Sequence, residues 1–318
     1  MVQNSFPKAL RDHGGGLDAA AAEYGGQPVD WIDLSTGINP VPYPILALSD
    51  KAWGALPDAA AEQALVSAAR DFWQIPDNAA VLAVPGASAA IAALPRVLTG
   101  QKVNIPKPTY NEHQAGFEAA GWALSAEAAA QVLVHPNNPD GRLWSAGDFD
   151  HTTLTIIDES FCDVTPHQSH VAQSGQPGRV ILKSFGKFWG LAGLRLGFVI
   201  AQPDLIADLK AHLGPWPVSG PALEIGAAAL SDPAWARETR KRLAEDAIRL
   251  DALMTSAGVT ALGGCDLFRL YDVKDAKVWQ VRLAKHHIWS RIFPYSDSWL
   301  RLGLPGPKDW DRLEAALT

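Results

Sequence analysis

Short apolar segments recur along the first two thirds of the chain, separated by helical stretches and by turns rich in glycine or proline. Six of them predict buried strands, at residues 81–84, 102–105, 131–134, 154–158, 180–184 and 197–200. Alanine-rich stretches at 87–98 and 111–120 predict helices between them. Apolar strands that alternate with helices are typical of an α/β layer fold with a mostly parallel sheet. Ligands of such sheets bind at the carboxyl ends of the strands.

The pattern changes after residue 203. Residues 234–254 place charged side chains beside Leu243, Ile248 and Leu253, which predicts a long solvated helix with one apolar face. Short strands at 267–271, 288–292 and 299–302 then alternate with helices near 278–285 and 308–317. Residues 1–40 have two glycine runs and little apolar core. We therefore predict an N-terminal arm (1–40), a large domain (41–205) and a smaller α+β C-terminal domain (206–318).

Composition narrows the class of protein. The 318 residues are 47% hydrophobic and 19% charged, as in a folded globular protein. A net charge of -7 argues against nucleic acid as the main partner. No apolar run approaches the ~20 residues of a membrane span, and the first residues lack a signal-peptide pattern, so we expect a cytoplasmic location. The two cysteines, Cys162 and Cys265, are too few to predict a metal site.

Lys187 is the most informative residue for chemistry. It lies in the run SFGKFWGLAGLRLG at residues 184–197, among small and apolar side chains. An apolar setting disfavours the ammonium form and helps the amine attack an aldehyde, whereas Arg195 is a permanently charged fork suited to a phosphate. An aldehyde and a phosphate on one cofactor indicate pyridoxal phosphate. The alternative is a surface lysine in a glycine-rich turn.

Three other strand ends offer the remaining groups that this cofactor needs. Asp158 ends an apolar strand, and its carboxylate would keep the pyridine nitrogen protonated. Asn138 is a candidate donor to the phenolic oxygen, and Tyr110 a candidate to stack on the ring. Each has a structural alternative: a helix cap for Asp158, a simple turn for Asn138 and ordinary packing for Tyr110. We expect the neighbouring Glu159 to be solvated or to support Asp158.

The cofactor phosphate requires backbone N–H groups at the start of a helix, together with hydroxyl and cationic partners. Gly86, Ala87 and Ser88 follow a predicted strand and begin a predicted helix. Ser184 and Arg195 supply a hydroxyl and a cation. The sequence therefore predicts a phosphate site built from these two segments.

Three strings together resemble the fold-type I aminotransferases of the histidinol-phosphate branch. They are PNNPDG at 136–141, DESF at 158–161 and the Lys187 run at 184–197. This resemblance implies a pyridoxal phosphate enzyme with a large cofactor domain and a small C-terminal domain. It also implies a homodimer with active sites at the subunit boundary.

The N-terminal region is similar to a narrower family, the threonine-phosphate decarboxylases of cobalamin biosynthesis. The similarity rests on DHGGGLDAA at 12–20 and WIDLSTGINP at 31–40. It implies loss of carbon dioxide from L-threonine O-3-phosphate to give (R)-1-amino-2-propanol phosphate. From these strings we assign His13 and Asn39 to the substrate side.

The chain departs at three positions from the pattern of the families that it resembles. Phe161 stands where many aminotransferases of this branch carry a tyrosine near the phenolic oxygen of the cofactor. Leu56 stands where many have a tyrosine that reaches the partner's phosphate, and Gly186 replaces a frequent serine or threonine. These changes remove individual cofactor contacts but leave the lysine, aspartate, asparagine and arginine in place.

Two arginines in the C-terminal strands can anchor a small phosphorylated amino-acid substrate. Arg291 and Arg301 lie in apolar surroundings, where a guanidinium requires an anionic partner. By resemblance Arg301 matches the arginine that binds the substrate carboxylate, which leaves Arg291 and His13 for the phosphate. The alternatives are structural ion pairs for the arginines and a solvent-facing position for His13.

The residues that bind the cofactor do not by themselves select the reaction. The bond that breaks is the one held perpendicular to the cofactor ring, so orientation decides between decarboxylation and transamination. Lys187 is the expected proton donor to Cα after carbon dioxide leaves. The sequence favours the decarboxylase, with a histidinol-phosphate or related aminotransferase as the alternative. A regulator that binds the cofactor without catalysis would need a DNA-binding module, which the sequence does not indicate.

Overall fold

The larger part of the molecule is built on a five-stranded sheet with the order β2-β8-β7-β6-β5. This is seen in a computed structural model that describes residues 12–45 and 47–318, so the first eleven residues of the predicted arm lie outside it. The strands are β2 (Ala80–Val84), β5 (Ala130–Val134), β6 (Leu154–Asp158), β7 (Arg179–Ser184) and β8 (Gly197–Ala201). Strands β5, β6 and β7 are mutually parallel, and β8 is antiparallel to β7 and β2. The predicted mostly parallel sheet is confirmed.

Two short strands extend this sheet beyond β5. Strand β3 (Lys102–Val103) pairs in parallel with β4 (Ala123–Leu124). Just after β3, Asn104 forms a parallel bridge with Gln131 of β5. The segment predicted as a strand at 102–105 is therefore regular only over its first two residues.

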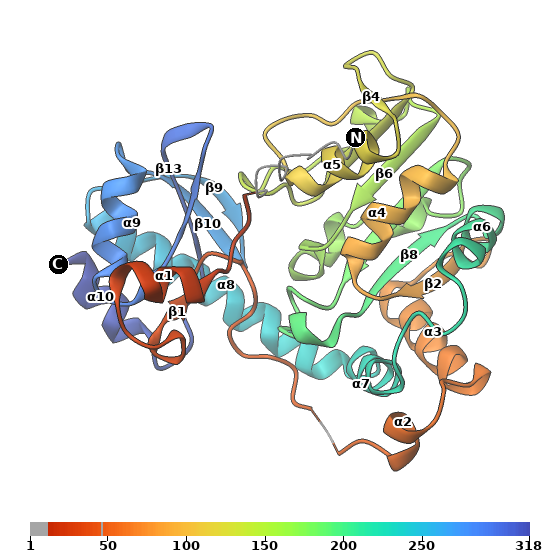
Figure 1. Ribbon diagram of the computed structural model, residues 1–318, viewed down its shortest axis with the longest axis horizontal. Coiled ribbons are helices and arrows are strands. Elements are labelled where there is room, and N and C mark those ends of the chain that lie inside the picture. Colours follow the sequence, from red (N-terminus) through yellow and green to blue (C-terminus); the bar gives the residue numbers. More distant parts are fainter. Residues whose placement is uncertain (1–11, 46) are drawn as a thin grey trace, which may run out of the picture.

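Both faces of the sheet are covered, because adjacent strand residues are apolar and point to opposite sides. Ile156 and Val180 belong to the core beneath α4 (Ala87–Val97), α5 (Asn111–Ala119) and α6 (Pro203–Leu213) (Figure 1). Their neighbours Ile157 and Ile181 pack on the other face. That face is covered in part by the short 3₁₀ turns between β5 and β7, at Ala146–Asp148, Cys162–Val164, Pro166–Gln168 and Val171–Gln173.

A helical layer adjoins the β2 end of the sheet. Helix α3 (Ala59–Trp73) packs against α7 (Gly220–Leu230), and α2 (Asp50–Gly54) contacts α7 as well. Caps set the starts of these helices: Asp58 accepts a hydrogen bond from Ala61 N, and Ser219 accepts one from Ala222 N. The predicted boundary at residue 206 assigns most of α6 and all of α7 to the C-terminal domain, but these helices pack on α4, β2 and α3 of the larger part.

The smaller part contains an antiparallel sheet with the order β12-β13-β10-β9. Its strands are β9 (Thr260–Cys265), β10 (Phe268–Asp272), β12 (Arg291–Phe293) and β13 (Ser296–Gly303). Helices α9 (Ala276–Ala284) and α10 (Trp310–Leu317) pack beside it. Helix α8 (Pro233–Ser256) runs between the two parts (Figure 1). Its buried residues recur every three or four positions, as the sequence predicts for one apolar face.

The described part of the N-terminal arm is attached to the smaller part. Helix α1 (Leu17–Tyr24) packs through two alanines against Trp31 and Ala284. After a 3₁₀ turn (Pro28–Asp30), β1 (Ile32–Asp33) pairs in parallel with β11 (Ile288–Trp289). The chain then crosses to the Lys187 loop, where Asn39 N donates to Lys187 O over 3.1 Å. Within the described ranges, no helix combines the length and the apolar composition needed to cross a membrane.

Candidate active site

The predicted cofactor residues meet at one edge of the large sheet. Strands β2, β5, β6 and β7 are parallel, so the segments that follow them emerge on the same side. Strand β8 runs the opposite way and begins there, two residues after Arg195. Alternating strands and helices thus bring residues that are more than 100 positions apart into one site.

A cavity at this edge is lined by nearly all of the side chains predicted to hold the cofactor. Its walls come from the start of α4, the end of β6 and the loop that carries Lys187. The lining residues with polar or aromatic side chains are Ser88, Tyr110, Asn138, Asp158, Ser160, Phe161, Ser184, Lys187 and Arg195. Gly186 and Ala87 also line it.

Asp158 is a buried carboxylate held in place by three hydrogen bonds. His113 Nε2 lies 2.8 Å from its Oδ2, and the Ser160 amide and hydroxyl donate to its Oδ1. Burial raises the pKa of Asp158, but the hydrogen bond to His113 and those from Ser160 outweigh it, and the pKa is lowered. The carboxylate is therefore charged at neutral pH although it lies in the protein interior.

Lys187 extends into the cavity from the loop after β7. Its Nζ donates to the carbonyl of Thr36 over 3.2 Å and lies 5.3 Å from the ring centre of Phe161. Burial lowers the pKa of Lys187 to about 8, and the positive charge of Arg301 acts in the same direction. Roughly a tenth of the amine is then unprotonated at pH 7, and this free amine is the nucleophile that attacks an aldehyde.

The start of α4 and Arg195 line the same cavity and form an arrangement suited to an anion. Gly86 precedes the helix with φ 84° and ψ 151°, a conformation open almost only to glycine. A Cβ on Gly86 would lie 2.7 Å from Nη2 of Arg195. The guanidinium therefore lies directly against the helix entrance, where the first backbone N–H groups of α4 lack partners within the helix.

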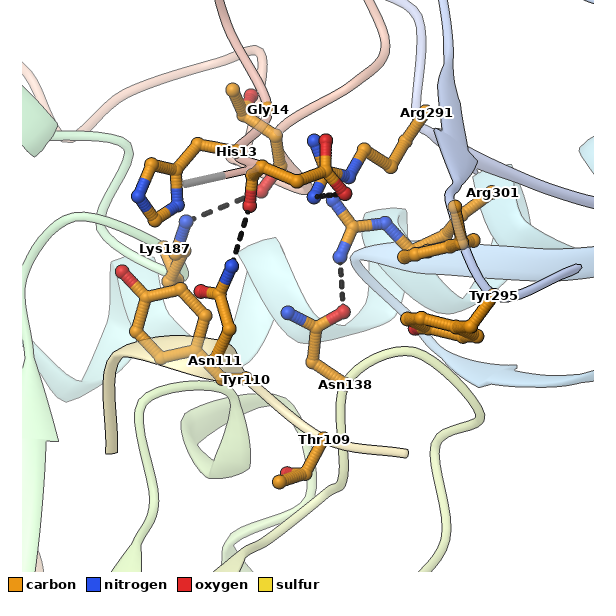
Figure 2. A pocket seen from close by; sticks show the side chains of 13 residues that line it. His13, Gly14, Thr109, Tyr110, Asn111, Asn138, Lys187, Arg291, Tyr295 and Arg301 are labelled. Carbon is orange, nitrogen blue, oxygen red and sulfur yellow. Dashed lines mark hydrogen bonds and ion pairs between the residues drawn. The ribbon is translucent and has the colours of Figure 1, made fainter. Parts of the chain in front are cut away.

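A second cavity adjoins the first and shares Lys187, Tyr110 and Asn138 with it. Figure 2 shows side chains from the arm, the large sheet edge and the C-terminal strands converging on it. Arg291 of β12 and Arg301 of β13 lie on the wall opposite the large sheet. The second cavity thus joins the lysine to two fixed positive charges.

The two arginines have different partners. Arg301 is buried and donates to Asn138 Oδ1 and to the carbonyl of Ser35, both neutral acceptors. Its Nε has no hydrogen-bond partner among the residues that the structure describes. Burial lowers the pKa of Arg301 to about 10, with a further contribution from Arg291, so it stays protonated at neutral pH. Arg291 instead forms an ion pair with Asp12, at 2.7 Å.

His13 lies at the mouth of the same cavity. Its Nε2 is 3.0 Å from a carboxylate oxygen of Glu112, in the first turn of α5. The His13 ring also lies 6.2 Å from the ring of Tyr110. The arm therefore contacts the wall of the cavity through two successive residues, Asp12 and His13.

Comparison with known proteins agrees with this geometry. The sequence matches the family described as aminotransferase class I and II over residues 29–130 and 122–317. The chain belongs to the class I and II aminotransferase family. Members of this family depend on pyridoxal phosphate. The cofactor cavity described above fits that group, because a buried carboxylate, a lysine of lowered pKa and a helix entrance with an arginine line it together.

Its relatives place the chain more narrowly. It is 40% identical to a threonine-phosphate decarboxylase from Sinorhizobium sp, over 94% of this chain and 95% of that one. It is 38% identical to a threonine-phosphate decarboxylase from Pseudomonas aeruginosa, over 97% of both chains. In structure it resembles the histidinol-phosphate aminotransferase from Sinorhizobium meliloti, solved with pyridoxal 5'-phosphate, with a TM-score of 0.82 at 19% identity, over 100% of this chain and 97% of that one. Within the family the chain belongs to the threonine-phosphate decarboxylase branch, which confirms the resemblance drawn from the sequence.

The geometry of this family member corrects two expectations. Asn39 does not line either cavity: its Nδ2 donates to Phe188 O, and its Oδ1 accepts from Arg242 and from Val41 N. A buried amide with both ends engaged ties the arm to the Lys187 loop and does not reach a substrate. Glu159 is not solvated, because it is buried against Lys183 at 2.6 Å.

The three departures from the family pattern lie in different places. Phe161 lines the cofactor cavity without a hydroxyl and packs edge-on against Phe268, with ring centres 4.9 Å apart. Gly186 also lines the cavity, and its N–H donates to the hydroxyl of Ser184. Leu56 lies exposed between α2 and α3, outside both cavities.

Several side chains of the site were missed by sequence reasoning. His113 follows Tyr110 by three residues, and this spacing puts both on one side of the first turn of α5. That spacing could have predicted that His113 reaches the same site. For Asp12 the only signal was its position next to His13. Thr36 and Ser160 lie within the strings 31–40 and 158–161 but were not singled out there, and Asn111, Phe293 and Tyr295 carried no signal in the sequence that set them apart.

Proposed function

We propose that this protein catalyses the pyridoxal phosphate-dependent decarboxylation of L-threonine O-3-phosphate to (R)-1-amino-2-propanol phosphate, a step in cobalamin biosynthesis. The observation that carries the proposal is the junction of the two cavities at Lys187. One cavity suits the cofactor, and the other presents two arginines to a substrate with two anionic ends. Two relatives that are 40% and 38% identical over nearly the whole chain are named threonine-phosphate decarboxylase.

We assign each residue of the first cavity to a different group of the cofactor. When the cofactor is bound, Lys187 would hold it through its aldehyde group, and Asp158 would keep the pyridine nitrogen protonated. Tyr110 would cover a ring face, and Nδ2 of Asn138 would donate to the phenolic oxygen, since the Oδ1 of Asn138 is engaged by Arg301.

We propose that the start of α4 binds the phosphate of the cofactor. We assign it to the N–H groups that follow Gly86, to Ser88 and Ser184, and to Arg195. These groups surround one end of the cavity, and the helix start favours negative charge through its dipole.

The second cavity orients the substrate. When bound, pyridoxal phosphate accepts the electron pair of a bond broken at Cα. We assign the substrate carboxylate to Arg301, which is buried close to Lys187 and has an unpartnered Nε. The substrate phosphate falls to Arg291 and His13. With both anionic ends anchored, the protein determines which bond at Cα stands perpendicular to the cofactor ring.

Lys187 completes the reaction by handling a proton. Carbon dioxide leaves with the carboxylate carbon, and Cα then needs one proton in its place. Lys187 Nζ is the proposed donor, because its lowered pKa allows it to exchange protons near neutral pH.

A product assay tests the proposal directly. The holoenzyme is incubated with L-threonine O-3-phosphate, and carbon dioxide and aminopropanol phosphate are quantified. Amino transfer to 2-oxoglutarate is measured in parallel, from threonine phosphate and from histidinol phosphate. Decarboxylation that is lost in Lys187→Ala and kept in Lys285→Ala, an exposed lysine of the small part, supports the proposal. Amino transfer without release of carbon dioxide would refute it.

We further propose that the protein is a homodimer. Trp53 and Leu56 follow one another closely around α2 and are 73% and 64% exposed. Trp216 is exposed just before α7, the helix that α2 contacts. Large apolar side chains gathered on one surface are typical of a protein interface. Light scattering on the purified protein measures the mass: a single-chain mass of 34.0 kDa would contradict the dimer.

A further inference from the structure

The anion-binding side of the site already contains an anion supplied by the chain itself. Asp12 lines the second cavity, and its Oδ2 lies 2.7 Å from Nη2 of Arg291. The Arg291 side chain is only 12% exposed, whereas that of Asp12 is 41% exposed. Arg301 has no carboxylate partner within the part of the chain that the structure describes. The charge of Arg291 is therefore neutralised by the arm, whereas the charge of Arg301 is not paired with a carboxylate of the described residues.

The path of the arm holds Asp12 in this position. A Cβ on Gly14 would collide with the carbonyl oxygen of Ser35, so this path of the backbone requires a glycine at position 14. Gly15 N donates to the hydroxyl of Ser35 over 2.7 Å. On the other side, Asn111 Nδ2 donates to the carbonyl of Asp12 over 2.8 Å (Figure 2 shows Asn111 on this wall). The backbone is fixed on both sides of the cavity mouth, and the Asp12 carboxylate is held by its ion pair with Arg291.

We propose that Asp12 determines the specificity of the reaction for a doubly charged phosphate, by occupying Arg291 until such a group displaces it. This inference rests on the proposed function, because it assigns the substrate phosphate to Arg291. It makes Asp12 a specificity-determining residue and gives it no part in the chemical steps.

The charges explain how the discrimination works. A phosphate ester carries about −1.5 to −2 charges at pH 7, whereas the Asp12 carboxylate carries one. When a dianionic phosphate takes the place of the Asp12 carboxylate beside Arg291, the attraction to the guanidinium becomes stronger, since the Coulomb energy scales with the product of the charges. When a monoanionic group takes that place, one ion pair with Arg291 is replaced by another of similar strength. A neutral side chain cannot displace Asp12, because it would leave a largely buried guanidinium unpaired.

The test compares two substrates of the same shape and different charge. L-threonine O-phosphate and L-threonine O-sulfate are assayed with wild type, Asp12→Asn and the control Asp18→Asn. Asp18 lies exposed in the first turn of α1, on the same arm. Asp12→Asn should lower KM for threonine phosphate by about 3- to 10-fold with kcat within about twofold, and lower the phosphate-to-sulfate ratio of kcat/KM by about tenfold. Asp18→Asn should match wild type.

A binding measurement keeps the inference separate from the proposed function. Inorganic phosphate is titrated into each holoenzyme by calorimetry, without turnover. Asp12→Asn should bind it about 3- to 10-fold more tightly than wild type, and Arg291→Gln should lose this binding. An unchanged or weaker affinity in Asp12→Asn, or binding that persists in Arg291→Gln, overturns the inference. Absence of decarboxylation in wild type, with tighter phosphate binding in Asp12→Asn, would instead refute only the proposed reaction.

Discussion

A single added methyl group at Gly86 should weaken the cofactor site without removing any of its side chains. Gly86 has φ 84° and ψ 151°. An alanine there takes a backbone conformation that costs about 1–3 kcal/mol. Part of this strain appears as reduced stability, and the rest as distortion of the entrance to α4. Gly86→Ala should therefore lower the melting temperature and disturb the backbone N–H groups that we assign to the phosphate.

The same methyl group also displaces Arg195. The added Cβ would lie 2.7 Å from Nη2 and 3.1 Å from Cζ, whereas ordinary contacts of this kind begin at 3.4 Å. The guanidinium must retreat by about 0.7 Å, which is enough to lengthen a charge-assisted hydrogen bond beyond its useful range. Loss of one such bond costs about 1.5–3 kcal/mol, which corresponds to a Kd for pyridoxal phosphate about 10- to 150-fold higher.

Titration of the apoenzyme with pyridoxal phosphate measures this effect through the absorbance of the bound cofactor. Gly193→Ala is the matched control, since Gly193 lies exposed on the same loop as Arg195 and a Cβ there meets no atom within 4 Å. The control should bind the cofactor as wild type does. If Gly86→Ala kept the wild-type Kd within about twofold, the assignment of the phosphate to this helix entrance would be wrong.

Three buried ionisable side chains each give a further prediction. Because the pKa of Lys187 is lowered to about 8, the rate of cofactor capture by apoenzyme should rise with pH up to about 8 and then level off; stopped-flow absorbance that still rises toward pH 10 would contradict it. Burial lowers the pKa of His135 to about 4 in the folded protein. As the pH falls, His135 is therefore protonated in the unfolded chain before it is protonated in the folded one. Up to about 3 kcal/mol of unfolding free energy should be lost between about pH 6.5 and pH 4. His135→Gln should flatten that loss in urea unfolding. Lys183→Met, which leaves Glu159 buried and unpaired, should cost about 3–5 kcal/mol of unfolding free energy, and Lys285→Met should cost almost none.

The cofactor side of the site was predictable because each of its parts is local in the sequence. Lys187 lies in a run of small residues, Asp158 ends an apolar strand, and Gly86 joins a strand to a helix. Parallel strands bring such ends to one edge whatever the lengths of the connections between them. The order of these motifs therefore predicted the fold, and it singled out residues that line one cavity.

The positions of α6 and α7 could not be predicted in the same way. Their composition is compatible with either part of the molecule, and packing alone decides that they lie on α4, β2 and α3. The role of Asn39 was hidden for a similar reason. Its partners Phe188 and Arg242 are 149 and 203 residues away, and no local pattern indicates that the amide is fully engaged.

The sequence by itself determined the sheet, the reactive lysine and its family, since these depend on hydrophobic period and on short motifs. Only the tertiary structure decided how charges are paired. It joined Asp12 to Arg291 across 279 residues, left Arg301 among neutral acceptors, and buried Glu159 against Lys183. Pairing depends on distance and burial in three dimensions, because the free energy of a charge is set by its neighbours and by its access to water. The motifs therefore predict the chemistry that we propose at Lys187, and the charge pairing between the folded arm and the C-terminal strands carries the substrate selection that we propose.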